Sequence, residues 1–166
     1  MLFSIETGTE NEILRKKSEL INSIDRTILK LIKDMKATMK KEKGIGLAAP
    51  QVGFNVRVIL VTLDNKSVVP MINPKIILHS NATEFGEEGC LSVPGKWAQI
   101  KRYSEITVEY LDEKGSQQTL KLNELNARVV QHEIDHLDGI LFTDYLESEN
   151  NILNIIDYQG SGMRNL

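Results

Sequence analysis

The most informative stretch of the chain is Gln131-His132-Glu133-Ile134-Asp135-His136-Leu137, an HExxH segment late in an apolar-periodic region. Helical residues four apart project from the same face, so His132 and His136 can bind one metal ion. Glu133 lies roughly 100° around the helix axis from His132, which leaves its carboxylate free for proton chemistry. A surface helix with two solvated histidines has the same pattern, so other residues must separate the two interpretations.

The size and composition of the chain suit one globular domain. With 166 residues, 41% of them hydrophobic, it can bury a core without a structural metal. The formal net charge of −3 gives no broad attraction to nucleic acid or anionic lipid, so we expect neither as a partner. Cys90 is the only cysteine, and no window approaches the roughly 18 apolar residues of a membrane span. Residues 1–10 lack the pattern of a targeting signal, so the expected location is the cytoplasm.

Helical periodicity is clear in the first quarter of the chain. Asp25 is a suitable N-cap for a helix whose apolar residues recur at spacings of three and four, namely Ile28, Leu31, Ile32, Met35 and Met39. Short β-rich runs follow over residues 56–63 and 68–72, with a weaker candidate over 75–79. Pro70 and Pro74 are expected to mark breaks or sheet edges, because proline cannot donate to a central ladder.

The second half of the chain predicts a hairpin and two helices. Residues 105–112 alternate in polarity, and a turn leads from them into residues 117–122. Asn123 is a candidate N-cap for the HExxH helix, which Gly139 would end. A last helix is expected over about residues 148–157, before a frayed polar tail. This order predicts a single α+β domain over residues 1–166, with antiparallel strands packed around a central metal-binding HExxH helix.

A catalytic metal site usually has three protein ligands, so the two histidines need a third. Proteases of the HExxH class draw on a downstream residue, and Glu147 and Glu149 are available. The upstream alternative is Cys90 in the segment Glu88-Gly89-Cys90-Leu91-Ser92, where a glycine allows close approach of the backbone to a ligand. A buried, inert thiol would also explain an isolated cysteine. These residues alone leave the third ligand open.

A third segment, Gly44-Ile45-Gly46-Leu47-Ala48-Ala49-Pro50-Gln51, completes a pattern. With the segments at residues 88–92 and 131–137, the chain resembles the peptide deformylases, whose GxGLAAPQ, EGCLS and QHExDHL segments occur in this order. The resemblance extends from the first predicted helix to about Leu146. Three separate segments in order are far more specific than HExxH alone.

The resemblance implies a metal site and a reaction. Cys90, His132 and His136 would bind one divalent ion, Fe(II) in the cell, with Zn, Ni or Co able to take its place, and water would be the fourth ligand. The implied reaction is hydrolysis of the formyl group from N-formylmethionyl nascent peptides, which releases formate. Glu133 would carry the proton from water to the leaving nitrogen. Donors to the developing oxyanion would be the Gln51 amide and the Leu91 backbone N–H.

The resemblance also implies the substrate-binding residues, which are Ile45, Gly46, Gly89, Leu125 and Val129. Gly44 and Gly46 would let the substrate add to a strand-like loop as an extra strand. Many relatives have an arginine about five residues after EGCLS, where this chain has Trp97, and this departure puts contacts beyond the first substrate residue in doubt. Transient contact with the ribosome is implied too. Docking through a basic C-terminal helix, as in some relatives, is not expected because residues 147–166 include three acidic residues and only Arg164 as a basic one.

Two other classes of function are compatible with parts of the sequence. One is a zinc endopeptidase with a downstream carboxylate ligand, which the EGCLS segment disfavours. The other is a binding protein that kept the fold and lost the chemistry, which the joint presence of the metal-binding and catalytic residues disfavours. Cleavage of formyl-Met-Ala-Ser without cleavage of internal peptide bonds would separate the three.

Overall fold

The computed structural model of the protein describes residues 1–64, 66–148 and 156–157. Within these residues the helices are α1 Glu12–Arg15, α2 Arg26–Glu42, the 3-10 helix η1 Ala49–Val52, α3 Glu124–Leu137 and α4 Asp144–Ser148. The strands are β1 Gly46–Ala48, β2 Val58–Leu63, β3 Ser67–His79, β4 Thr83–Cys90, β5 Val93–Tyr103, β6 Glu105–Leu111, β7 Gln117–Asn123 and β8 Ile156–Asp157. None of the helices in the described part is long and apolar enough to cross a membrane.

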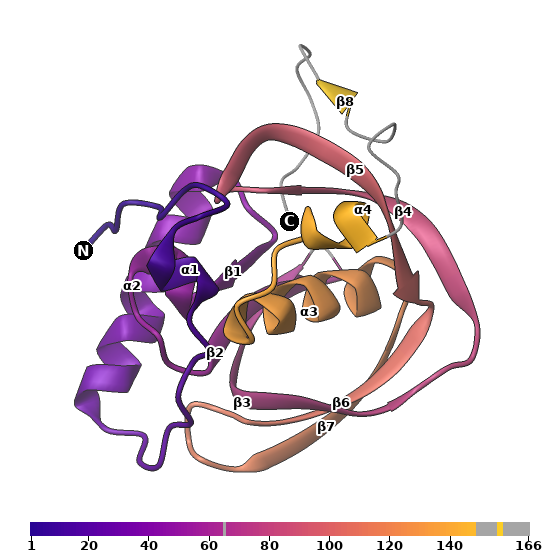
Figure 1. Ribbon diagram of the computed structural model, residues 1–166. Coiled ribbons are helices and arrows are strands. Elements are labelled where there is room, and N and C mark those ends of the chain that lie inside the picture. The colour runs from indigo at the N-terminus through magenta and orange to yellow at the C-terminus, as the bar shows by residue number, and fades with distance from the viewer. Residues whose placement is uncertain (65, 149–155, 158–166) are drawn as a thin grey trace.

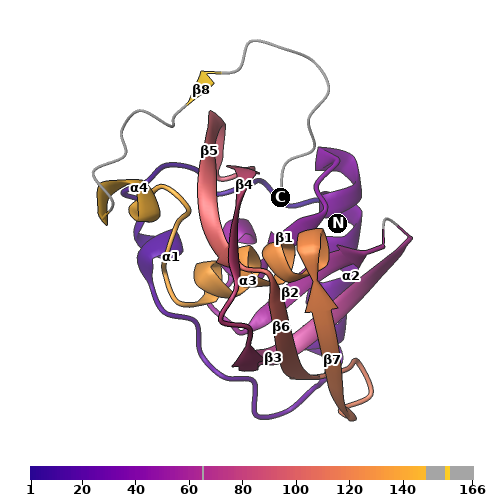
Figure 2. The same cartoon turned by 90° about the vertical axis from the view of Figure 1, so that its right-hand side faces the viewer.

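The strands form two antiparallel sheets. One has the order β1-β2-β3-β6-β7, and the other has the order β4-β5-β8. In Figures 1 and 2, α3 lies in the middle of the molecule with strands of both sheets around it, while α2 lies at one side. The expected α+β class with antiparallel strands is therefore confirmed.

The helix α2 forms where the apolar spacing predicts it. The Asp25 side chain caps its first turn by accepting hydrogen bonds from the backbone N–H groups of Thr27 and Ile28. Its inner face is buried in a core cluster with residues of β2 and with Leu47 of β1, and this face includes Leu31, Ile32, Met35 and Met39. The prediction for this helix is confirmed.

The helix α3 is buried on most of its faces, unlike a helix at the protein surface. Val129, Val130, Ile134 and Leu137 pack into a core cluster with residues of the five-stranded sheet. The helix begins directly after Asn123, whose side chain makes no capping hydrogen bond, and it ends before Gly139. A buried helix inside two sheets can hold its polar side chains in fixed positions, because close packing leaves few alternative rotamers.

The hairpin prediction is confirmed, since β6 and β7 pair from Glu105↔Asn123 to Leu111↔Gln117. Pro70 and Pro74 both lie inside one strand, β3, yet they do mark an edge and a break of the ladder, as expected. Proline is tolerated here because Pro70 lies where β3 pairs with β2 only, and Pro74 lies in the irregularity of the β3–β6 ladder between Ile72 and Lys75.

The prediction of a helix over about residues 148–157 is wrong for the part of that range that the structure describes. The structure places a helix earlier, at Asp144–Ser148, and Ile156–Asp157 is a strand that pairs with Lys96 and Trp97 of β5. Residues 149–155 and the expected frayed tail lie outside the described residues. A short strand paired with a distant strand has no periodic signal of its own, which explains the error.

Candidate metal centre and catalytic site

Cys90, His132 and His136 come together where the end of β4 meets α3. Cys90 ends β4, and both histidines project from α3. Their possible ligand atoms lie within 4.8 Å of one another, and the Cys90 Sγ atom lies 3.2 Å from His136 Nε2. All three side chains are buried. The structure thus brings a thiol from one sheet to the two imidazoles that the HExxH spacing predicts.

The hydrogen-bonding state of these residues fits a metal ion. His132 Nε2 is buried and has no hydrogen-bond partner among the described residues. A buried polar atom without a partner is costly, and a metal ligand bond would satisfy it. One thiolate and two imidazoles are donors that suit zinc or iron, and three protein ligands leave a fourth position open for water or substrate.

A buried ionic cluster holds the first of the two histidines. Glu88 accepts hydrogen bonds from Arg102 and Arg128, and its Oε2 atom lies 2.9 Å from His132 Nδ1. Burial opposes ionisation of Glu88, but the bonds from Arg102 and His132 outweigh it and hold its pKa well below the usual range. An anionic Glu88 fixes His132 in the tautomer that presents Nε2 to a metal.

The cluster also extends outward from Glu88. The Arg102 guanidinium donates to Asp135, and Tyr145 of α4 donates to the same carboxylate. Of these residues, the sequence placed Glu88 and Asp135 inside the matching segments without a role, and it gave no signal for Arg102, Arg128 or Tyr145. Long-range pairing of this kind becomes visible only when β4, β5 and α3 are placed side by side.

Glu133 is fully buried, and neither carboxylate oxygen has a hydrogen-bond partner among the described residues. It faces β1, because a Cβ atom built on Gly46 would lie 2.2 Å from Glu133 Oε1. Burial is the main cause that raises the pKa of Glu133, to about 7. A carboxyl group with a pKa near neutrality can both accept and return a proton.

Gln51 lies beside the thiol of Cys90 at full burial. Its Oε1 atom accepts a hydrogen bond from the Ala48 backbone N–H at 2.8 Å, which orients the amide. Its Nε2 atom lies 3.4 Å from Cys90 Sγ and 3.2 Å from Ser92 Oγ. The amide group therefore donates to one of the possible ligands, Cys90, and to the neighbouring Ser92. Ser92 was not singled out from the sequence, although its backbone N–H also donates to Cys90 Sγ.

The residues expected to bind substrate lie in different environments. Ile45 and Val129 are buried in the core cluster under the five-stranded sheet, whereas Leu125 is 45% exposed on the first turn of α3. Gly89 pairs with Trp97 across β4 and β5, and a Cβ atom on Gly89 would lie 2.7 Å from the Trp97 ring. Trp97 thus covers one side of Gly89, next to the possible ligand Cys90.

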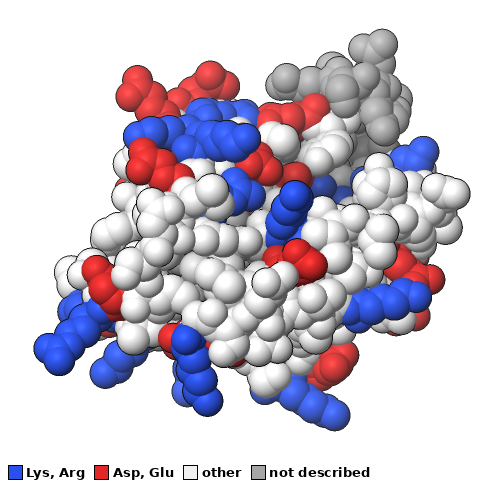
Figure 3. All heavy atoms as spheres, turned by 90° about the horizontal axis from the view of Figure 1, so that it is seen from below, with Lys and Arg blue, Asp and Glu red and all other residues white. Residues whose placement is uncertain are grey.

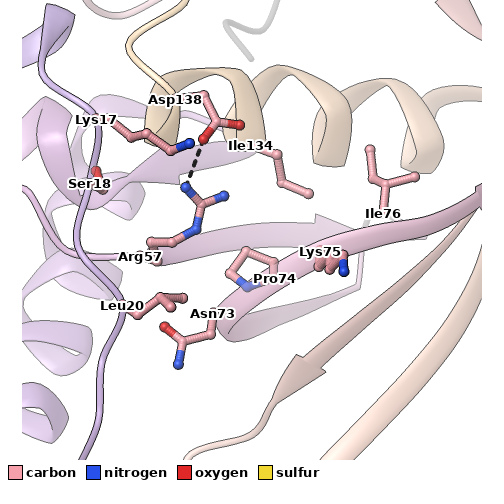
Figure 4. A pocket seen from close by; sticks show the side chains of 10 residues that line it. All are labelled: Lys17, Ser18, Leu20, Arg57, Asn73, Pro74, Lys75, Ile76, Ile134 and Asp138. Atoms are coloured by element: carbon pink, nitrogen blue, oxygen red, sulfur yellow. Dashed lines mark hydrogen bonds and ion pairs between the residues drawn. The ribbon is translucent and has the colours of Figure 1, made fainter.

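A separate pocket of about 520 Å³ lies beside the C-terminal end of α3 (Figure 4). Arg57 crosses it to reach Asp138, with 2.8 Å between the guanidinium and the carboxylate. Ile134 and Asp138 are the residues of α3 and its end that line it, and none of the three possible ligands does. The face shown in Figure 3 mixes both signs of charge around a broad uncharged centre.

A family model described as polypeptide deformylase matches residues 5–151. The chain belongs to the peptide deformylase family. A peptide deformylase of Pseudothermotoga lettingae is 46% identical over 136 residues, which cover 82% of this chain and 78% of that protein. The crystal structure of peptide deformylase from Thermotoga maritima matches with a TM-score of 0.84 and 36% identity, covering 87% of this chain and 97% of that one.

A third relative is a class I type b peptide deformylase from Acinetobacter baumannii, solved with bound Met-Ala-Ser. It has a TM-score of 0.82 and 33% identity, over 87% of this chain and 98% of that one. Family membership makes this chain a metal-dependent hydrolase that removes the N-formyl group from newly made polypeptides. The resemblance in the three sequence segments is confirmed, and the Cys/His/His group can hold the metal on which the family depends.

Proposed function

We propose that the catalytic roles fall on the residues gathered around Cys90. In this proposal Cys90, His132 and His136 hold one divalent ion, Glu133 carries protons, and Gln51 and the Leu91 backbone N–H stabilise the oxyanion. The observation that supports it most is the convergence of three possible ligand atoms within 4.8 Å beside a buried carboxylate that has no partner among the described residues.

The bound ion is proposed to be Fe(II) in the cell, with Zn, Ni or Co able to replace it. When bound, it supplies Lewis acidity, which lowers the pKa of a water molecule and polarises the formyl carbonyl. The thiolate of Cys90 favours softer metals than a carboxylate would. Elemental analysis after purification under nitrogen tests the choice of iron, and recovery of a different stoichiometric metal would contradict it.

Glu133 performs both proton transfers. As an anion it accepts a proton from the attacking water, and it then gives a proton to the nitrogen that leaves, so that formate and a free amine result. A buried group without hydrogen-bond partners suits this task, because no competing bond must be broken when the substrate arrives. Burial raises its pKa, which favours uptake of a proton, and the carboxyl group can then return that proton.

Gln51 and Leu91 act on the formyl oxygen as negative charge develops there. The Gln51 amide is held by Ala48, so its N–H groups are already oriented before the reaction. Donors fixed in a buried site need no reorganisation during the reaction, which is why they lower the barrier. Leu91 follows Cys90 directly in the chain, so its N–H belongs to the same short segment as the thiolate.

The substrate is proposed to be an N-formylmethionyl nascent peptide, as the family activity implies. Its first side chain would contact Ile45, Gly46, Gly89, Leu125 and Val129. The bound Met-Ala-Ser in the Acinetobacter baumannii relative supports a peptide with methionine first. Such substrates arise at translation, so we place the activity in the cytoplasm with transient access to the ribosome. We also propose that residues 1–166 act as one catalytic domain, with the HExxH segment on α3 at its centre.

Turnover of three substrates separates this proposal from its alternatives. Formyl-Met-Ala-Ser, its acetylated analogue and an unformylated peptide with internal bonds are each incubated with the metal-loaded protein. We expect formate release from the first peptide and no internal cleavage in the third. Internal cleavage would favour the endopeptidase, whose candidate ligand Glu149 lies outside the described residues, and binding without turnover would favour a non-catalytic relative.

A further inference from the structure

Arg128 is a buried arginine of α3 that reaches both long strands of the three-stranded sheet. Its guanidinium donates to the Glu88 carboxylate at 2.9 Å. It also donates to three backbone carbonyl oxygens, those of Glu84 at 3.0 Å, Gly86 at 3.4 Å and Ile100 at 2.8 Å. Ile100 belongs to β5 and the other acceptors belong to β4. Arg128 therefore fastens α3 to both strands, which lie beside it in Figures 1 and 2.

One carboxylate connects Arg128 to the proposed metal ligand His132. Arg128 precedes His132 by four residues, so the two side chains lie on the same face of α3. Arg128 donates to Glu88 Oε1, and Oε2 of the same carboxylate lies 2.9 Å from His132 Nδ1. Cys90, the possible ligand from the sheet, ends the strand β4 to which Arg128 is fastened. The bonds of Arg128 thus hold α3 and β4 together one helical turn before His132.

Gly86 makes room for this guanidinium. A Cβ atom built on Gly86 would lie 2.7 Å from the Nε, Cζ and Nη2 atoms of Arg128. Gly86 has no left-handed backbone angle, so the conformation of β4 does not itself require a glycine there. The close approach of the guanidinium does require it. A side chain at this position would push either the guanidinium or β4 aside.

Arg57 offers a comparison within the same molecule. It too is fastened to α3, because it donates to the Leu137 carbonyl at 3.4 Å and to the Asp138 carboxylate at 2.8 Å. Arg57 directly precedes β2 of the five-stranded sheet, and none of its described contacts involves Glu88 or β4. An arginine that only holds the fold together should behave like Arg57 when metal binding is measured.

We propose that Arg128 is a positioning residue which, together with Gly86, fixes the metal ligands of α3 relative to the ligand of β4. This step rests on the proposed function, because it takes Cys90, His132 and His136 as the ligands. Ligands that are already held in place lose less conformational freedom when the ion binds, so the ion binds more tightly. Loss of a residue that supports a metal ligand usually lowers metal affinity by about 10- to 100-fold.

The dissociation constant for Zn(II), measured by competition with a chromogenic chelator, tests the proposal. Arg128→Met keeps a long side chain but loses the hydrogen bonds, so the constant should rise by about 10- to 100-fold. Gly86→Ala should raise it by a smaller factor, because the new methyl group displaces a guanidinium that is still present. In the double variant, Gly86→Ala should raise it no further than Arg128→Met alone, because no guanidinium remains to be displaced.

Arg57→Met is the matched control, since it makes the same substitution in an arginine that holds the same helix. It should lower the free energy of unfolding of the metal-free protein and leave the dissociation constant for Zn(II) nearly unchanged. An equal rise in Arg57→Met, or an unchanged constant in folded Arg128→Met, would overturn the proposal. If Arg128→Met does not fold, Gly86→Ala decides, and a constant equal to that of the parent protein would overturn it.

Failure of the proposed function would look different. A parent protein that binds no Zn(II), or whose metal-loaded form releases no formate from formyl-Met-Ala-Ser, would refute that function and this role of Arg128 with it. A parent protein that binds the ion and is active, but whose affinity for Zn(II) does not depend on Arg128 or Gly86, would refute only the positioning role.

Discussion

Replacement of Gly46 by alanine should disable Glu133 while leaving the fold intact. The new Cβ atom would lie 2.2 Å from Glu133 Oε1, 2.8 Å from Cδ and 3.0 Å from Cγ. The carboxylate must therefore move by about 1 Å, and a displacement of this size can cost about 10²-fold in rate. We expect kcat for formyl-Met-Ala-Ser to fall by about that factor.

The stability of Gly46→Ala should stay within about 1 kcal/mol of the parent protein. The atoms that must move are the end of one flexible side chain, and the carboxylate has no hydrogen bond to lose among the described residues. Gly46 also has no left-handed backbone angle that an alanine would strain. Thermal unfolding and metal content should therefore be nearly unchanged.

A double-mutant cycle tests whether Gly46→Ala lowers kcat by displacing Glu133. Glu133→Ala alone should lower kcat by about 10² to 10⁴, the usual effect of a lost acid–base group. If Gly46→Ala acts through Glu133, adding it to Glu133→Ala should slow turnover no further. Additive losses, or a normal kcat in Gly46→Ala with its metal bound, would refute the placement of Glu133 against β1.

Three further substitutions test the surroundings of the site. Gln51→Leu should lower kcat by about 10² or more with little change in KM, and a change confined to KM in steady-state kinetics would mean that Gln51 only holds the substrate. Cys90→Ser should lose tightly bound metal on dialysis and most activity, because a neutral hydroxyl replaces a thiolate, whereas full retention of both would remove Cys90 from the ligand set. Glu88→Gln leaves Arg102 and Arg128 short of a buried counter-charge, so the free energy of unfolding measured in urea should fall by about 3 kcal/mol. The control Glu84→Gln, at an exposed position, should change it little, and equal losses in the two variants would contradict this reasoning.

Local signals explain which elements were predictable. The helix α2 has an N-cap and a regular apolar spacing, and the β6–β7 hairpin has alternation on both sides of a turn. The strands β4 and β5 have neither, because Glu84, Glu87 and Lys101 mix charge with glycine and aromatic residues along them. Their pairing depends on each other and on α3, so it could not be inferred from either segment alone.

The candidate site, like the fold, could be predicted from local sequence signals only in part. The spacing of His132 and His136 fixes their common face in any helix, so their proximity was predictable. The approach of Cys90 and Gln51 depends on how β4 and η1 fold against α3, and only the family resemblance pointed to it. The role of Arg102 and Arg128 around Glu88 had no local signal, because their partners are 14 and 40 residues away in the chain.

The central claim is that one metal ion, held by Cys90, His132 and His136, makes this chain a deformylase. Titration of Fe(II) into the metal-free protein under nitrogen, with formate release from formyl-Met-Ala-Ser as the signal, tests it most directly. We predict that activity rises linearly, saturates at about one equivalent of iron, and yields one formate for each new amine, in keeping with three protein ligands around one ion. Turnover by the metal-free protein, or no formate at saturation, would contradict the claim.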